Sequence, residues 1–178
     1  SANRPEYFIV GKGTSDAKAA IEAAMALGIP KDTIIYFAVD FDTMDYQVTD
    51  LILPYFQEVH EVMSESIYRT GIYGTRNTCS RVAEAGYTCS SFVGDMSSGF
   101  SGNLGYKIPE DWAFDQFFTV KNDTSLGFEI DKDAVSGRDQ GVSYLDTVKE
   151  DPSEQYTIDY GEPLSGTVEA PIIEFLNT

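Results

Sequence analysis

The stretch Thr33–Asp42, TIIYFAVDFD, decides the fold class of this 178-residue chain. It is a run of β-branched and aromatic residues, which favours a buried strand, and it ends in two carboxylates separated by one residue. Because side chains alternate along a strand, Asp40 and Asp42 are expected on one face. In α/β folds the carboxyl ends of strands usually carry the chemistry, and a close pair of carboxylates suits glycoside hydrolysis. The alternative is a strand that runs out into a solvated acidic turn.

Composition and charge describe a globular and strongly acidic chain. The 42% hydrophobic and 13% aromatic content fits a packed core, and the length fits one main domain. The net charge of −17, from 29 acidic and 12 basic residues, argues against nucleic acid or an anionic membrane as partner. No apolar run approaches the ~20 residues of a membrane span, and no signal peptide is visible. We therefore expect no nucleic-acid partner and no membrane insertion.

Metal-binding patterns are weak. The single histidine, His60, lies in a helix-like stretch with no partner at zinc-ligand spacing. The acidic series Asp40, Asp42, Asp45 starts like a calcium loop, but Asp45 stands at position six, where an EF-hand needs glycine, and Leu51 at position twelve, where it needs glutamate. We predict no metal site and no cofactor.

The two cysteines, Cys79 and Cys89, flank the end of a predicted helix and a glycine turn. This arrangement could bring the thiols together, and a disulfide would indicate an oxidising compartment. Two independent buried thiols are the alternative.

Helical and strand patterns alternate along the chain. Such alternation predicts a parallel sheet with right-handed helical crossovers. The predicted helices are Ser15–Leu27, Tyr46–Ser66 and Arg76–Ala85, the predicted strands are Thr33–Asp42, Arg69–Gly74, Ser90–Asp95, Asp111–Val120 and Gly127–Asp131, and Met96–Gly105 is a glycine- and serine-rich loop.

Beyond about Gly141 the pattern becomes acidic and rich in turns. Two weak strand candidates lie in this region, Glu154–Tyr160 and Ala170–Leu176. We interpret residues 149–178 as an acidic linker or the start of an appended module.

The predicted strand ends carry a series of polar residues: Asp40-Phe41-Asp42, Tyr73-Gly74-Thr75, Asp95-Met96-Ser97, Asp115-Gln116-Phe117 and Asp131-Lys132-Asp133. Together with the helix GTSDAKAAIEAAMALG and the phrases IYFAVDFD, GIYGTRN, GFSGN and WAFDQF, this series resembles the glycoside-hydrolase-like domain of unknown function family (DUF1906) over about Gly11–Gly141. That family is related to the family 25 lysozymes, which are cell-wall muramidases.

The resemblance implies a fold of the (β/α)8 TIM-barrel type, of which this chain carries about the last five strands. Residues 1–148 would be the C-terminal portion of the barrel, and Ser1–Gly13 the loop after the third strand. Five strands cannot close a barrel, and open strand edges invite pairing. We expect another polypeptide segment to complete the sheet.

The resemblance also implies the site. Asp42 takes the position of the glutamate in a D-x-E pair, and its side chain is one methylene shorter than that glutamate. At this position we expect the general acid. Asp40 would stabilise charge or orient an acetamide of the substrate. The predicted catalytic residues are Asp40, Asp42 and Asp131, and the predicted substrate-binding residues are Tyr73, Asp95, Trp112, Asp115 and Gln116. By alternation, Trp112, Phe114 and Gln116 share one face, and so do Glu129, Asp131 and Asp133.

The resulting expectation is hydrolysis of peptidoglycan or a related N-acetylated glycan by a secreted or cell-wall-associated protein. Spacing does not choose between retaining and inverting chemistry. A non-catalytic wall-binding module with a degenerate site, motivated by the Asp-for-Glu change, is the second hypothesis, and a structural or interaction fragment is the third.

Overall fold

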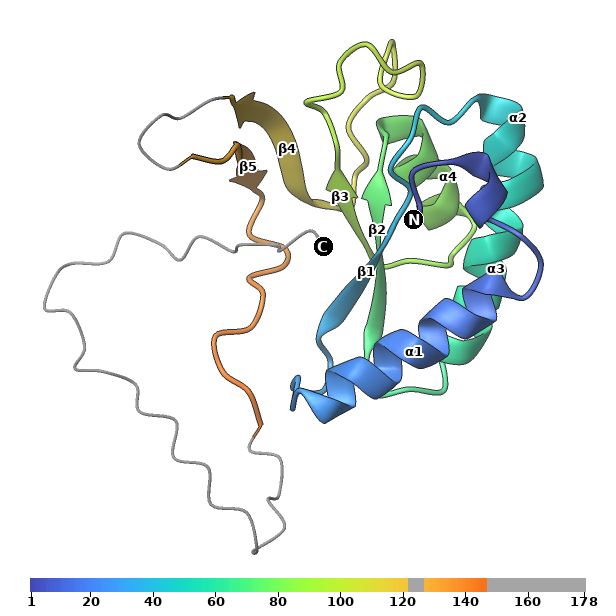
Figure 1. Cartoon of the computed structure of the whole chain (residues 1–178), viewed down its shortest axis with the longest axis vertical. Coiled ribbons are helices and arrows are strands. Elements are labelled where there is room, and N and C mark those ends of the chain that lie inside the picture. Colours follow the sequence, from blue (N-terminus) through green and yellow to red (C-terminus); the bar gives the residue numbers. More distant parts are fainter. Residues whose placement is uncertain (122–126, 147–178) are drawn as a thin grey trace, which may run out of the picture. The chain divides into compact units, whose positions relative to one another are not determined.

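Figure 1 shows the chain as a computed structural model. The structure describes residues 1–121 and 127–146. The chain divides into two units, Ser1–Val148 and Lys149–Thr178, and all described residues belong to the first. The two weak strands expected near the C-terminus, and the linker or module expected from residue 149, lie outside the described residues.

The first unit is built on one five-stranded sheet with the order β1-β2-β3-β4-β5. The pairs β1–β2, β2–β3 and β3–β4 are parallel, whereas β4 and β5 are antiparallel. The prediction of a wholly parallel sheet is therefore wrong at its last strand, because an antiparallel partner can follow without a crossover helix. The strands are β1 (Ile34–Ala38), β2 (Arg69–Gly74), β3 (Ser90–Val93), β4 (Trp112–Val120) and β5 (Ile130–Val135).

The sheet is not closed. Among the described strands β1 and β5 are the two edges, and they do not pair with each other. The predicted TIM barrel is therefore not confirmed, and the observed architecture is a mixed α/β fold with an open sheet.

The predicted helices are present with shifted bounds. The stretch predicted as one helix from Tyr46 is a continuous helical segment whose middle part is a π-helix, in which the Leu53 N–H bonds to the Val48 carbonyl. Pro54 follows directly and has no N–H to donate, so a local change in hydrogen-bond pattern suits it. The helical elements are η1 (Pro5–Tyr7, 3-10), α1 (Lys12–Ala26), α2 (Asp45–Gln47), η2 (Val48–Ile52, π), α3 (Leu53–Met63) and α4 (Arg76–Glu84).

The helices lie on one side of the strands, and the main hydrophobic core fills the space between (Figure 1). Phe37 and Ile72 contribute to it from the sheet, and Phe56 from α3 is fully buried. The opposite face carries a cluster of aromatic rings with centroids 5.2–6.1 Å apart, formed by Tyr36, Tyr73, Phe92 and Phe114. We call this opposite side the inner face.

The helices α1 and α3 pack so closely that their contact needs a glycine. A Cβ on Gly13 would lie 2.2 Å from the Tyr55 carbonyl oxygen. The α3 residue Glu58 reaches the start of α1, where Oε1 accepts the Gly11 N–H at 2.7 Å and Oε2 accepts the Gly13 N–H at 3.0 Å. A side chain 45 residues away along the chain thus caps this helix.

Both cysteines are free, so the disulfide is not formed, and the alternative of two buried thiols holds for Cys79 but not for Cys89. The buried Cys79 thiol on α4 donates toward the Phe92 carbonyl, and the exposed Cys89 thiol donates to the Thr70 carbonyl. Burial raises the pKa of Cys79.

In the described ranges no helix is both long and apolar enough to cross a bilayer.

Candidate functional site

The two acids of the opening motif follow β1 rather than belonging to it. The strand ends at Ala38, although the Val39 N–H still donates to the Tyr73 carbonyl of β2. The Asp40 N–H donates instead to the Ala2 carbonyl at 2.9 Å. Alternation holds only while a strand stays paired, and here the acids go to different neighbours. Both acids therefore lie beyond the end of β1, where strand alternation no longer assigns their side chains to a face.

Asp42 holds the loop that follows β3. Its Oδ1 accepts the Ser101 N–H and the Ser101 hydroxyl, both at 2.7 Å, and the Gly102 N–H at 3.5 Å. Gly102 packs so closely that a Cβ there would lie 2.3 Å from Thr75 Oγ1. The carboxylate thus joins the segment after β1 to the glycine-rich loop.

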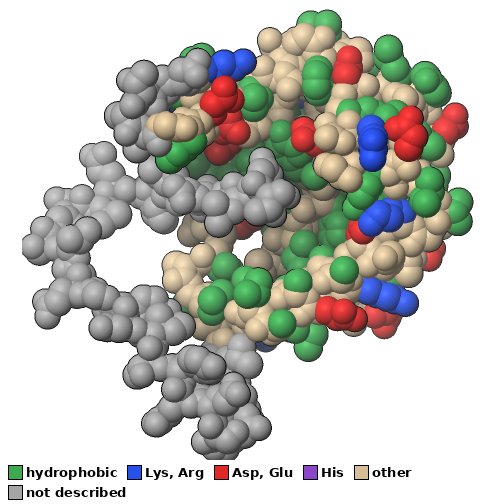
Figure 2. Space-filling model, viewed as in Figure 1, with side chains coloured by type: hydrophobic (Ala, Val, Ile, Leu, Met, Phe, Trp, Pro, Cys, Tyr) green, Lys and Arg blue, Asp and Glu red, His purple; other side chains and the backbone are tan. Residues whose placement is uncertain are grey.

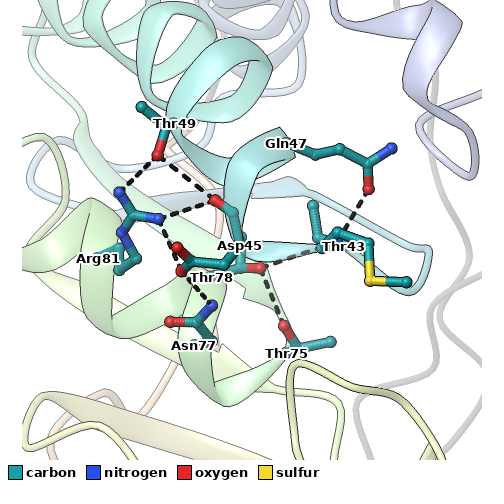
Figure 3. A network of polar contacts seen from close by, with 9 residues as sticks. Thr43, Asp45, Gln47, Thr49, Thr75, Asn77, Thr78 and Arg81 are labelled. Atoms are coloured by element: carbon teal, nitrogen blue, oxygen red, sulfur yellow. Dashed lines mark hydrogen bonds and ion pairs between the residues drawn. The ribbon is translucent and has the colours of Figure 1, made fainter.

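A second network fixes the segment after Asp42 against α4 (Figure 3). Arg81 donates to both the carbonyl and Oδ1 of Asp45 at 2.9 Å, and to Thr49 Oγ1 at 2.8 Å. Asn77 also donates to Asp45 Oδ1, at 3.1 Å. The Asn77 hydrogen bond and the Arg81 charge lower the pKa of Asp45. Beneath them, the hydroxyls of Thr75, Thr78 and Thr43 form a buried chain.

Four side chains from β2, β4 and β5 form a hydrogen-bonded chain. The Tyr73 hydroxyl donates to Gln116 Oε1 at 2.7 Å, and Gln116 Nε2 donates to Asp131 Oδ2 at 2.8 Å. Thr119 donates to the other oxygen of Asp131 at 2.6 Å. We call Tyr73, Gln116, Thr119 and Asp131 the mouth chain.

Two further acids surround the mouth chain. The pKa of Tyr73 is raised by burial and, to a smaller extent, by the negative charges of Asp40, Asp131 and Asp133. Burial raises the pKa of Asp40, and burial together with Asp131 raises that of Asp133. Acidic side chains gather over the β4–β5 hairpin in Figure 2. Asp40 accepts no hydrogen bond from any described residue, so its carboxyl group is available to a ligand.

A separate acidic group lies beside the start of α4. Arg76 forms a two-pronged ion pair with Asp95 and also donates to the Tyr106 carbonyl at 2.9 Å. Burial and the neighbouring Asp95 raise the pKa of Asp115, whose Oδ1 has no hydrogen-bond partner in the described part of the chain. Two of the predicted substrate-binding residues, Asp95 and Asp115, thus belong to a group organised by Arg76 rather than to the mouth chain.

The family follows from the comparison of this chain with known proteins. Residues 1–135 match the model of the Rv2525c-like, glycoside hydrolase-like domain. The chain belongs to this family. The glycoside-hydrolase-like family expected from the motifs is therefore confirmed, with the activity left open.

Two Bacillus subtilis (strain 168) relatives carry a similar domain. The uncharacterized protein YbfG is 52% identical over 145 residues, which cover 77% of this chain and 20% of YbfG. The uncharacterized protein FadG is 44% identical over 152 residues, which cover 83% of this chain and 26% of FadG. The chain thus spans about a fifth to a quarter of these relatives, and neither name gives an activity.

A solved structure shares the fold. The Mycobacterium tuberculosis Tat-secreted protein Rv2525c, crystallised in complex with HEPES, matches with a TM-score of 0.55 and 21% identity, over 70% of this chain and 56% of that one. The open α/β sheet of the present chain is thus consistent with a glycoside hydrolase-like fold.

In this Rv2525c-like domain, the remaining predicted residue, Trp112, is set apart from the mouth chain. It pairs with Ser91, whereas Phe114 pairs with Phe92, and a register shift lies between the two pairs. Since Ser91 and Phe92 point to opposite faces of β3, the expectation that Trp112 and Phe114 share a face is wrong.

A hollow of about 310 Å³ lies along the free edge of β1, lined by Tyr36 and Ala38 of the strand and by Asp16 and Tyr55 of the helices, among others. Asp16 accepts hydrogen bonds from the Tyr7 and Tyr55 hydroxyls and pairs with Lys12, so its charge is already satisfied.

Across the described ranges no group of three or more potential ligands is placed to hold a metal ion.

Sequence reasoning missed two residues of this site. Thr119 lies three positions after Gln116, and alternation assigns it to the opposite face. Arg76 carries a charge that sequence alone does not pair with Asp95. Its position directly after GIYGT, at the start of a predicted helix, indicates that Arg76 lies near the strand ends, but it does not identify Asp95 as the residue it pairs with.

Proposed function

We propose that this domain hydrolyses a glycosidic bond in peptidoglycan or a related N-acetylated glycan, with Asp40 and Asp131 as the acting carboxyl groups. The contrast between two acids carries the proposal. The mouth chain holds Asp131 by both oxygens, whereas Asp40 accepts no hydrogen bond from the described residues and has a raised pKa. Two carboxyl groups in contrasting environments are the arrangement that glycosidases need.

In this scheme Asp40 is the general acid. It donates its proton to the glycosidic oxygen as the bond from that oxygen to the anomeric carbon breaks. The Asp131 carboxylate stabilises the positive charge that develops on the sugar ring. Water then adds hydroxide to the anomeric carbon, and its proton returns to Asp40. The contacts of Asp42 favour a supporting role, which reverses the roles first expected for Asp40 and Asp42.

The test is release of reducing ends from purified peptidoglycan by the full chain. We expect Asp40→Asn and Asp131→Asn to lower turnover at least 100-fold, and the matched control Asp50→Asn, on the exposed side of the helical segment, to leave turnover unchanged. Parental turnover in Asp40→Asn would exclude the acid role.

A non-catalytic wall-glycan-binding module is the second candidate. Its supporting observation is that Asp42, which occupies the position of a family acid by motif, is used to hold a loop. Sedimentation with insoluble wall glycan separates the two: retention without turnover favours binding, and loss of both favours a structural role.

We also propose that the protein works outside the cytoplasm, in secreted or wall-associated form. The support is the export of the structural neighbour, a Tat-secreted protein, together with a wall glycan as the proposed substrate. Fractionation of cells that express the natural protein tests this.

Finally, we propose that another polypeptide segment pairs with β1. The Asp40 N–H already bonds to Ala2, and by the strand repeat the N–H groups of Tyr36 and Ala38 point to the same open edge. We expect these two amide hydrogens to exchange rapidly in the isolated chain and to become protected when a strand binds. Protection in the isolated chain would contradict an open edge.

A further inference from the structure

The β4–β5 hairpin contains an irregularity beside the mouth chain. Gln116 pairs with Asp133 and Phe118 with Lys132, so β4 advances by two residues where β5 advances by one. Phe117 is the extra residue, which defines a β-bulge. Phe117 is half-exposed, at 50%, and is not required to fill the core.

The bulge changes which side chains share a face. In a regular strand Gln116 and Thr119, three residues apart, would point to opposite faces. With one residue inserted, Thr119 pairs with Asp131 and lies on the same face as Gln116. Phe118 takes the other face, where Lys132 lies over its ring at 6.0 Å. The bulge therefore brings two hydrogen-bond donors to one carboxylate.

The two donors divide the carboxylate between them. Thr119 binds Oδ1 of Asp131 at 2.6 Å, and Gln116 binds Oδ2 at 2.8 Å. The Thr119 hydroxyl also lies 3.3 Å from the sulfur of Met96, but its single proton makes the stronger bond with the charged oxygen. With both oxygens held, the carboxylate cannot rotate about its terminal bond without losing a bond.

We infer that Thr119 is a positioning residue for Asp131, placed on the inner face by the bulge at Phe117. This inference rests on the proposed function of Asp131 and names a residue that acts through it. By fixing the carboxylate plane, Thr119 keeps the charge aimed at the position of the sugar ring and keeps Gln116 turned toward Tyr73. A misplacement of about 1 Å at such a group can cost roughly 100-fold in rate, so a partial release should cost roughly tenfold.

The experiment compares three variants of the full chain. Thr119→Val removes the hydroxyl with little change in shape, and Thr119→Ser retains it. Ser136→Ala is the matched control, because it removes a hydroxyl from the same hairpin that donates to the Trp112 carbonyl, away from Asp131. We expect Thr119→Val to lower kcat on purified peptidoglycan roughly tenfold with KM changed less than about twofold. Thr119→Ser and Ser136→Ala should stay within about twofold of the parent.

A second measurement does not depend on turnover. The side-chain amide of Gln116, followed by ¹⁵N NMR, should exchange its hydrogens with water faster by roughly an order of magnitude in Thr119→Val, because the freed carboxylate no longer holds it. Thr119→Ser, which retains the hydroxyl, and the control Ser136→Ala should show the exchange rate of the parent. If the parent shows no turnover but Thr119→Val shows this change, the positioning role stands and the hydrolytic proposal fails.

Two results would overturn the inference. One is a Thr119→Val variant with the parental exchange rate and parental turnover. The other is a Thr119→Ser variant as impaired as Thr119→Val, because the loss would then come from packing of the methyl group and not from the hydroxyl.

Discussion

Asp40 and Asp42 are two residues apart and chemically identical, yet the structure uses them differently. Asp42 accepts three hydrogen bonds from the Ser101–Gly102 loop. Asp40 accepts none from the described residues, and burial raises its pKa. The side of the site with Asp42 is thus fixed, and the side with Asp40 is open to a ligand.

The difference shows that the role of an acid is set by the donors that reach it. A carboxylate that receives several backbone and hydroxyl donors is held in place by them and serves as an anchor. A carboxyl group with few donors and partial burial retains its proton more readily. The same contrast recurs between Asp95, paired with Arg76, and Asp115, which has one unpartnered oxygen.

The largest effect on stability should come from Asp42→Ala. Loss of the acceptor leaves the Ser101 N–H and hydroxyl without their partner and frees the loop, at a cost of about 2–3 kcal/mol in the free energy of unfolding. Asp40→Ala should change the same quantity by less than about 0.5 kcal/mol, since among the described residues no hydrogen bond to the Asp40 carboxyl is lost. Urea denaturation of both variants measures the contrast, and equal losses would remove the distinction between anchor and open acid.

Arg76→Met should have the next largest effect. The substitution keeps much of the aliphatic stem but leaves Asp95 and Asp115 side by side without a cation. Because the ion pair is partly exposed, we expect a loss of about 1–2 kcal/mol. The double variant Arg76→Met with Asp115→Asn should recover part of it, and a lack of any recovery would show that the two acids do not interact.

Asp115→Asn alone should stabilise the protein at pH 7. It removes a partly buried charge next to Asp95 while keeping the shape of the side chain, and we expect a gain of roughly 0.5–1 kcal/mol. Thermal unfolding at pH 7 and pH 4.5 checks the cause. The gain should shrink at the lower pH, where the parent carboxyl is more protonated, whereas a pH-independent gain would point to packing.

The smallest effect concerns the pH dependence of the parent. The folded-state pKa values of Asp40, Asp115 and Asp133 are raised, so the folded protein binds these protons at a higher pH than the unfolded chain does. The free energy of unfolding should therefore rise as the pH falls through the raised values toward the ordinary pKa of 3.8, by roughly 0.5–1 kcal/mol in all.

The pKa of Asp45 is lowered and acts in the opposite direction, but its contribution is lost only below its ordinary pKa. Above pH 3.8 the pH dependence of the free energy of unfolding is thus governed by the three acids with raised pKa values. Urea denaturation across pH 4 to 7 tests this, with a variant that carries asparagine at positions 40, 115 and 133 as control. A parent whose stability falls steadily on acidification across this window would contradict the assignment.

Elements with strong local patterns could be predicted from the sequence. The strand Arg69–Gly74 has the predicted bounds, and the helix from Arg76 differs by one residue at its end. Both are bounded by glycine or by a clear change in periodicity. The antiparallel β5 could not be separated from a parallel strand, because strand direction depends on the connection and leaves no mark in the alternation itself.

The site residues predicted from sequence stay a prediction, but the structure does join three of them: Tyr73, Gln116 and Asp131 lie in one hydrogen-bonded chain. The contacts that group them could not be predicted. Thr119 was missed because the bulge inserts one extra residue and so reverses the face on which the following side chains lie. A run of β-branched and aromatic residues does not reveal where such an insertion occurs. Long-range donors such as Ser101 are joined to Asp42 only by the fold.

The capping of α1 by Glu58 has a consequence for the order of folding. The first N–H groups of α1 are satisfied by Glu58, which lies 45–47 residues away along the chain. The N-terminus of this helix therefore cannot be completed while only contacts between sequence neighbours have formed. Contacts of long sequence separation form late because loop closure must come first. The first turn of α1 should therefore become ordered only when α3 docks, so that the two helices enter the native state as one kinetic unit.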